Sequence, residues 1–166
     1  MGYTHYWTLP PGDPRYAMEW PRIVADARRV VSAVRQRGMV IAGPDGYRRP
    51  MLDVSAGVAF NGDATTDLDY ETFALAAPGL GGPARTEFCK TGRRPYDLAV
   101  TAVLLRCRLL LPDVFLIGSD GDWDGEWLSG VADVGPLHGL GARRLVAELF
   151  GEVPPDNPFQ APDTSW

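Results

Sequence analysis

This chain of 166 residues has very few histidines and cysteines, and only one lysine. Two histidines cannot build a metal site that depends on several of them. Two cysteines, Cys89 and Cys107, are too few for a disulfide framework, and both fall in apolar segments that predict small buried side chains. The most apolar run, residues 100–111, is short and contains Arg106 and Arg108. It therefore predicts a core helix and not a membrane span.

Several sequence motifs of enzymes are also missing. The chain contains no serine or cysteine nucleophile elbow, no glycine-rich dinucleotide fingerprint and no phosphate-cradling loop of the NTPase type. We therefore expect no cofactor. The N-terminal residues do not have the pattern of a secretory signal peptide, which together with the few cysteines predicts a cytoplasmic protein.

Charge is laid out in alternating blocks, although the net charge of the whole chain is −5. Residues 1–50 and 85–112 each carry a net charge of +4, whereas residues 51–84 hold five acids and no base. Residues 113–166 carry a net charge of −8. A general nucleic-acid-binding surface requires a continuous basic face, so this layout argues against one and fits a local anion site better.

The hydrophobic pattern predicts a single α+β domain over residues 1–151, followed by a Pro-rich tail at 152–166. Strands are expected at 2–9, 39–42, 54–61, 71–75, 86–89 and 114–117, and helices at 20–37, 95–111 and 140–150. We expect one mixed, mostly antiparallel sheet with about three helices packed on it. The all-apolar strand 114–117 should be central in the sheet, and helix 95–111 should be the most buried helix.

The segment 87–97 is the best candidate for a functional site. It runs from an alternating strand through a basic loop into the long apolar helix, with Pro95 at the expected first helical position. A helix N-terminus attracts anions. Lys90, which lies beside it, is the only lysine of the chain, whereas the other fifteen basic residues are arginines. The residues expected to bind the anion from this loop are Lys90, Thr91, Arg93 and Arg94.

If the protein is an enzyme, few side chains are available for acid–base chemistry. The catalytic candidates are His5, Glu71, Glu87 and Asp120, with Lys90 and Asp97 as further titratable groups. Each also has a purely structural explanation. A histidine among aromatic residues is often a hydrogen-bonded core residue, Glu87 and Lys90 suit an ion pair, and Asp97 suits a helix cap.

The acidic run Asp120-x-Asp122-x-Asp124 matches the first half of a calcium-binding loop. The twelfth position, however, is Val131 where a bidentate glutamate is required, and a strand precedes the run where a helix is required. These differences exclude an EF-hand, and we expect no metal. An acidic turn explains the run, and a looser divalent-metal site is left open.

Five short motifs together resemble a family of small proteins found in tailed phages and in bacteria that carry prophages. The motifs cover most of the chain to about residue 130, and they are residues 2–7 (GYTHYW), 60–62 (FNG), 71–73 (ETF), 88–97 (FCKTGRRPYD) and 119–121 (SDG). The resemblance implies a phage-associated accessory protein acting in the host cytoplasm. It implies no catalytic residue, because no function is established for that family.

A phage accessory protein of this size is expected to interfere with a host enzyme or signal. Aromatic side chains beside the basic loop suit a nucleotide-like ligand. Its phosphate would lie on the loop, and its base would stack on an aromatic ring. Trp7 and Tyr96 are the aromatic residues that complete the predicted ligand-binding set. We therefore predict binding of an anionic, nucleotide-like small molecule, in a sequestering counter-defence role. A small hydrolase or transferase acting on a similar substrate and a protein-interaction module are the alternatives, and a homo-oligomer is left open.

Overall fold

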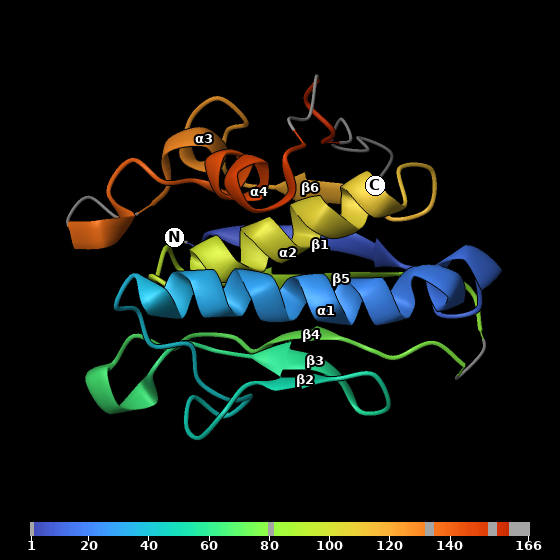
Figure 1. Ribbon diagram of the computed structural model, residues 1–166, viewed down its shortest axis with the longest axis horizontal. Coiled ribbons are helices and arrows are strands. Elements are labelled where there is room, and N and C mark those ends of the chain that lie inside the picture. The colour runs from blue at the N-terminus through green and yellow to red at the C-terminus, as the bar shows by residue number, and fades with distance from the viewer. Residues whose placement is uncertain (1, 80–81, 132–134, 153–155, 160–166) are drawn as a thin grey trace.

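The computed structural model describes residues 2–79, 82–131, 135–152 and 156–159, and Figure 1 shows its arrangement. The elements in chain order are β1 (Thr4–Leu9), α1 (Pro14–Gln36), β2 (Met51–Asp53), β3 (Gly57–Phe60), the 3₁₀ turn η1 (Ala64–Thr66), β4 (Phe73–Leu75), β5 (Arg85–Lys90), α2 (Asp97–Leu110), β6 (Ile117–Ser119), α3 (Glu126–Ser129), the 3₁₀ turn η2 (Gly135–Leu137) and α4 (Ala142–Phe150). The predicted α+β class is confirmed.

The strands form two small antiparallel sheets, so the expectation of one single sheet is wrong. The first sheet has the order β5-β1-β6 and the second has the order β2-β3-β4. They approach each other where the backbone N–H of Glu71 donates to the carbonyl of Lys90. The ladder goes no further, because the N–H of Lys90 donates to the Glu71 carboxylate at 2.7 Å and not to a backbone carbonyl. The Glu71 carboxylate thus accepts the hydrogen bond that would otherwise have continued a backbone ladder between the two sheets.

Strand β1 is the central strand of the first sheet, and its residues alternate as the sequence predicts. Tyr3, His5, Trp7 and Leu9 are all buried on the inner side. The expectation that residues 114–117 form the central strand is wrong. The N–H groups of Val114 and Phe115 bond to the Leu111 carbonyl at the end of α2, which leaves only Ile117–Ser119 to pair as the edge strand β6.

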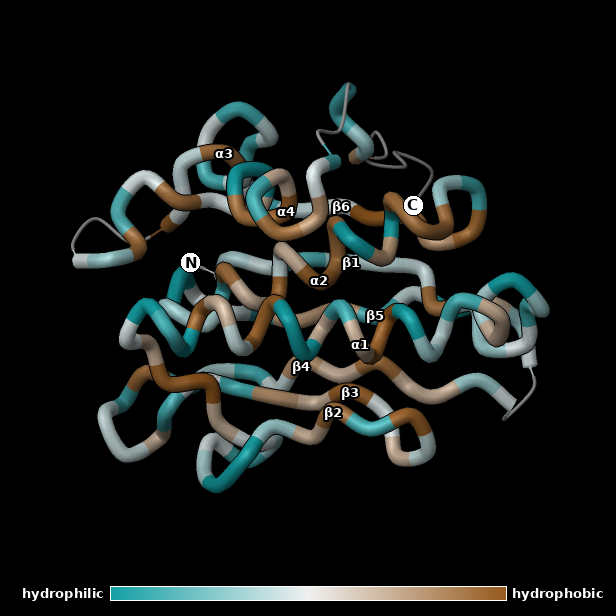
Figure 2. The backbone as a smooth tube through the Cα atoms, viewed as in Figure 1, coloured by the Kyte–Doolittle hydropathy of each residue, from teal (hydrophilic) through white to brown (hydrophobic). Residues whose placement is uncertain are grey.

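Helix α1 begins earlier than the Trp20-Pro21 pair suggests. It starts at Pro14, and the Asp13 carboxylate caps it by accepting the Arg15 N–H at 2.8 Å. Pro21 lies inside the helix. Hydrophobic and hydrophilic residues alternate along the turns of α1 (Figure 2), because one face packs on the core and the other meets solvent.

Helix α2 is the most buried helix, as predicted: every residue from Asp97 to Cys107 is buried. It begins at Asp97, two residues after the expected start. The long helices α1 and α2 lie side by side in Figure 1, with β1 and β5 behind them and β2, β3 and β4 below α1. The ring of Trp7 lies 5.1 Å from that of Phe73. Burial raises the pKa of Cys89 to about 12, so this thiol stays protonated.

The second sheet also departs from the expected strands. Of the predicted strand at 54–61, the second half forms β3, and residues 54–56 form the turn that joins β2 to β3, because the Asp53 carboxylate accepts the N–H groups of Ser55 and Ala56. The predicted strand at 39–42 is reduced to a single bridge between Ala42 and Asn61.

Part of the predicted tail is described, and it contacts the core. The Phe159 ring packs against Trp123 and Trp127 at centroid distances of 5.5 and 4.9 Å, and Glu152 pairs with Arg106. The remainder of the tail, at 153–155 and 160–166, lies outside the described residues. Within the ranges described above, none of the helices combines the length and apolarity needed to span a membrane.

Candidate ligand-binding site

Residues from separate motifs meet in one row at the end of the first sheet. Lys90 on β5 lies opposite Thr4 on β1. On the far side of Thr4, the Asp120 carboxylate accepts the Thr4 N–H at 3.0 Å, and the Asp120 N–H donates back to the Thr4 carbonyl. On the other edge, the Glu71 carboxylate accepts the Lys90 N–H. Three of the predicted site residues therefore lie in one row across the sheet.

Lys90 occupies the outer side of this sheet, on the same face as Thr4. Its side chain lies along Gly2, where a methyl group would come within 2.8 Å of Cε. No carboxylate of the described chain forms an ion pair with it, and Glu87, the partner that the sequence suggested, pairs instead with Arg85 at 2.6 Å. The ammonium group of Lys90 is therefore available to an external anion.

The loop after Lys90 is hydrogen-bonded to Tyr3, the residue that precedes β1. The N–H groups of Thr91 and Gly92 both donate to the Tyr3 carbonyl. Gly92 and Arg93 adopt the left-handed conformation, with φ of 58° and 59°. The Arg93 guanidinium lies over the Tyr3 ring at 4.3 Å and is 3.6 Å from Glu126. Arg93 thus already has an aromatic and an acidic partner.

The backbone of the first turn of α2 is less available to an anion than the sequence suggested. The Asp97 N–H donates to the Arg94 carbonyl at 2.9 Å, and the N–H groups of Ala99 and Val100 donate to Tyr96. The Asp97 carboxylate also lies in this turn and supplies the negative charge that the helix dipole favours. An anion site in this region must therefore depend on side chains.

Three residues of the predicted ligand-binding set are buried. Trp7 packs on Phe73, Thr91 bonds to Asp97, and the Tyr96 hydroxyl donates to the Glu71 carbonyl at 2.6 Å. Burial raises the pKa of Tyr96, so its hydroxyl stays neutral. These three therefore cannot contact a ligand at the surface. The members that reach its surface are Lys90, Arg93 and the half-buried Arg94.

His5 lies on the inner side of β1, at the centre of a buried hydrogen-bond chain. Its Nε2 is 2.6 Å from the Asp97 carboxylate, and its Nδ1 is 2.8 Å from the Ser119 hydroxyl. Because a carboxylate only accepts, Nε2 carries the proton and Nδ1 accepts from Ser119. The residues resemble a Ser-His-Asp triad, and neither Ser119 nor the role of Asp97 was predicted. Both fall within the motifs 119–121 and 88–97, which were the available signal for them.

The Ser119 hydroxyl is not arranged as a nucleophile. Its oxygen accepts the Trp127 Nε1–H and the Gly121 N–H, both at 2.9 Å, while its proton goes to His5. Both lone pairs are occupied, so none is directed at a substrate. The His5 ring is completely buried and packs edge-on against Trp127 at 5.6 Å. This chain of bonds therefore joins β1, β6, α2 and α3 as a structural network.

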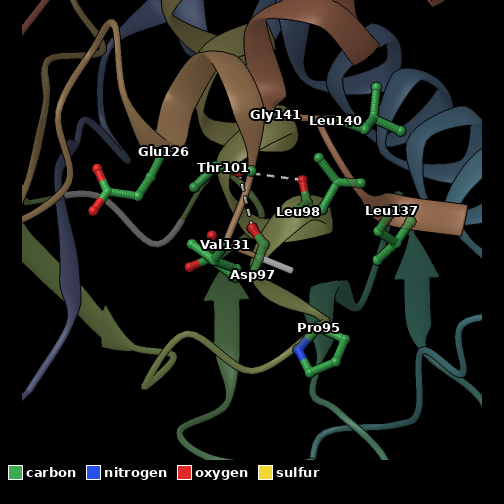
Figure 3. Close-up of a pocket in the computed structure, with 10 residues that line it drawn as sticks. Pro95, Asp97, Leu98, Thr101, Glu126, Val131, Leu137, Leu140 and Gly141 are labelled. Atoms are coloured by element: carbon green, nitrogen blue, oxygen red, sulfur yellow. Dashed lines mark hydrogen bonds between the residues drawn. The ribbon is translucent and has the colours of Figure 1, made fainter. Parts of the chain in front are cut away.

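Asp97 also borders a narrow pocket between α2 and α3. Figure 3 shows this pocket, in which the Thr101 hydroxyl bonds back to the carbonyls of Asp97 and Leu98. Its described lining is mainly apolar, with Asp97 and Glu126 as the two acids. Burial alone would raise the pKa of Glu126, but hydrogen bonds from backbone N–H groups and the nearby Arg93 guanidinium lower it. A pocket with two carboxylates does not suit an anion.

The outer face of the first sheet carries two exposed aromatic side chains. Tyr6 and Phe88 lie directly opposite each other on β1 and β5 and are 40% and 61% exposed. On the other side of Tyr6 stands Gly118 of β6, where an added methyl group would meet only the Tyr6 Cβ, at 3.9 Å. Alternation places these residues on the outer face, but only the strand register makes them neighbours. Lys90 follows Phe88 by two positions on the same face.

The acidic run after β6 is engaged with the protein. Asp124 pairs with Arg143 at 2.7 Å, and the Asp122 N–H donates to Glu126. The Asp120 carboxylate accepts the Thr4 N–H, as described above. These contacts account for the run as a turn that fixes the start of α3.

Comparison of the chain with protein-family models, with curated proteins and with solved structures finds no match, so its function must be inferred from this geometry.

Proposed function

We propose that the protein binds an anionic, nucleotide-like small molecule on the outer face of its first sheet. The observation that carries this proposal is the Lys90 ammonium, which has no ion-pair partner among the described residues and stands at the end of a face bearing two exposed aromatic rings. The proposal keeps the predicted ligand class. It replaces Trp7 and Tyr96, which are buried, by Tyr6 and Phe88 as the aromatic surface.

Spacing and chemistry support this ligand class. Two positions along a strand span about 7 Å, so a base on Phe88 would leave its phosphate near Lys90. A flexible ammonium is a compact point charge suited to a phosphate, whereas the neighbouring Arg93 is already held by Tyr3 and Glu126. Aromatic side chains stack on any nucleobase, so the face would accept the base without reading its edges.

Sequestration is the role that we propose, in keeping with a phage-associated accessory protein. The described side chains that the strands place on the outer face around the proposed ligand are threonines, Tyr6, Phe88 and Lys90. The two carboxylates beside Lys90, those of Glu71 and Asp120, are each engaged in accepting a backbone N–H at the end of the sheet. His5, another of the catalytic candidates, is on the opposite side of the sheet. A bound nucleotide would therefore be held and not hydrolysed.

A Lys90→Ala variant is expected to bind nucleoside 5′-monophosphates about 10- to 150-fold more weakly, since a hydrogen bond to a charged group contributes about 1.5–3 kcal/mol. Lys90→Arg should also lose affinity, because a wide guanidinium fork replaces a compact donor. Isothermal titration calorimetry with AMP, GMP, CMP and UMP measures the change. Folding stability should stay the same, because Lys90 has no partner to lose.

The matched control is Arg85→Ala, which removes an exposed cation from the other end of β5. Its affinity for the four nucleotides should equal that of the parent. If Arg85→Ala and Lys90→Ala weaken binding equally, the effect is one of general charge and the proposed site is wrong.

A further inference from the structure

We infer that the outer face of the first sheet takes a ligand with two nucleobases joined through phosphate, a dinucleotide. This inference rests on the proposed function and names its substrate class. It follows from one juxtaposition: two exposed rings in directly opposed positions on β1 and β5, a glycine beside one of them, and the Lys90 ammonium at their end.

The two rings provide separate places for two bases. Directly opposed residues of an antiparallel pair have Cβ atoms only about 4.5–5.5 Å apart, so Tyr6 and Phe88 present two exposed rings on neighbouring strands of the same face. Sheets that bind single-stranded RNA use aromatic residues on adjacent strands in this way, with one base on each ring. A mononucleotide would cover only one of the two rings.

Gly118 extends this surface on the β6 side. The backbone at this position does not require glycine, because its φ lies outside the left-handed region, and an added methyl group would meet only the Tyr6 Cβ. The absence of a side chain leaves the Tyr6 ring open from that edge. A base stacked on Tyr6 can therefore extend over β6 without a clash.

The charges limit the length of the ligand. Among the paired residues of β1, β5 and β6, Lys90 is the one cation on this face; Arg93 and Arg94 follow in the loop, where Arg93 is held by Tyr3 and Glu126. The chain as a whole is acidic, with a net charge of −5. Binding of a long single strand depends on many phosphate contacts, which one lysine does not supply. One linking phosphate with a base on each side matches the face, and a longer strand does not.

The test compares two ligands with the same number of phosphates. The dinucleotide pApA has two bases, whereas adenosine 3′,5′-bisphosphate has one. By calorimetry, pApA should bind the parent protein about 5- to 150-fold more tightly, the range for stacking one more base. Tyr6→Ala and Phe88→Ala should each abolish this difference, and Lys90→Ala should weaken both ligands.

A third variant, Gly118→Val, blocks the open edge without removing any contact. Valine favours a strand, so the melting temperature should be equal or higher. Its affinity for pApA should nevertheless fall to that for the bisphosphate. This result separates loss of the binding surface from loss of folding.

Two outcomes overturn the inference. If pApA binds no more tightly than the bisphosphate while both still depend on Lys90, the ligand has one base, and the proposed function stands without this extension. If sedimentation shows a dimer that Phe88→Ala converts to a monomer, a second copy of the chain occupies the face. Failure of both ligands to bind would instead reject the proposed function itself.

Discussion

An Asp97→Ala variant is expected to have a free energy of unfolding about 2–6 kcal/mol below that of the parent, because it leaves two buried donors without an acceptor at about 1–3 kcal/mol each. The donors are the Nε2–H of His5 and the hydroxyl of Thr91. Both are completely buried, so water cannot replace the lost carboxylate. Urea denaturation followed by circular dichroism measures the loss.

Asp97→Asn is the matched control, because its amide keeps one oxygen in the same position. We expect it to lose less stability than Asp97→Ala, since only the charge on the acceptor disappears. If Asp97→Ala unfolded like the parent while its ligand binding vanished, Asp97 would belong to the binding site. The hydrogen-bond network around His5 would then not be structural.

An Asp26→Ala variant is expected to lose about 3 kcal/mol of stability, the lower end of the range for breaking a buried ion pair, because the guanidinium loses one of its two carboxylate partners. Asp26 on α1 accepts from Nε of Arg106 on α2 at 2.8 Å, and Arg106 is 3% exposed. Arg106 also reaches Glu152 and lies over the Phe150 ring at 4.3 Å. The pair therefore joins α1, α2 and the end of α4.

Two further variants test whether the loss of stability in Asp26→Ala comes from burial of its ion pair. Glu148→Ala removes an exposed ion pair with Arg37 and should cost no more than about 1 kcal/mol. Adding Arg106→Met to Asp26→Ala should recover most of the lost stability, because an apolar side chain of similar length needs no partner. Equal losses from Asp26→Ala and Glu148→Ala would show that burial of the pair contributes nothing.

The sequence predicted those parts of the fold that depend on local periodicity. The buried face of β1 follows from alternation around His5 and Trp7, and the burial of α2 follows from its wide apolar surface. The division into two sheets depends on the Glu71 carboxylate taking the N–H of Lys90, a contact between residues 19 positions apart. No local pattern specifies such a contact.

The candidate site, too, combines features that the local sequence predicts with contacts that depend on the fold. Lys90 could be singled out as the only lysine, and its place at the strand end follows from the motif. The adjacency of Tyr6 and Phe88 depends on the register between β1 and β5, which sequence spacing does not determine. The involvement of Ser119 with His5 requires β1 and β6, whose contacting residues are 114 positions apart, to pair in the fold.

The central claim is that Lys90 holds an anionic, base-containing ligand, and one measurement tests it most directly. The parent protein and Lys90→Ala are each incubated with cell extract and purified again, and the small molecules released on denaturation are identified by mass spectrometry. We predict a phosphate-bearing, base-containing compound in the parent sample that is depleted at least tenfold in the Lys90→Ala sample. Equal amounts of the same compounds in both samples, or no such compound in the parent sample, would contradict the claim.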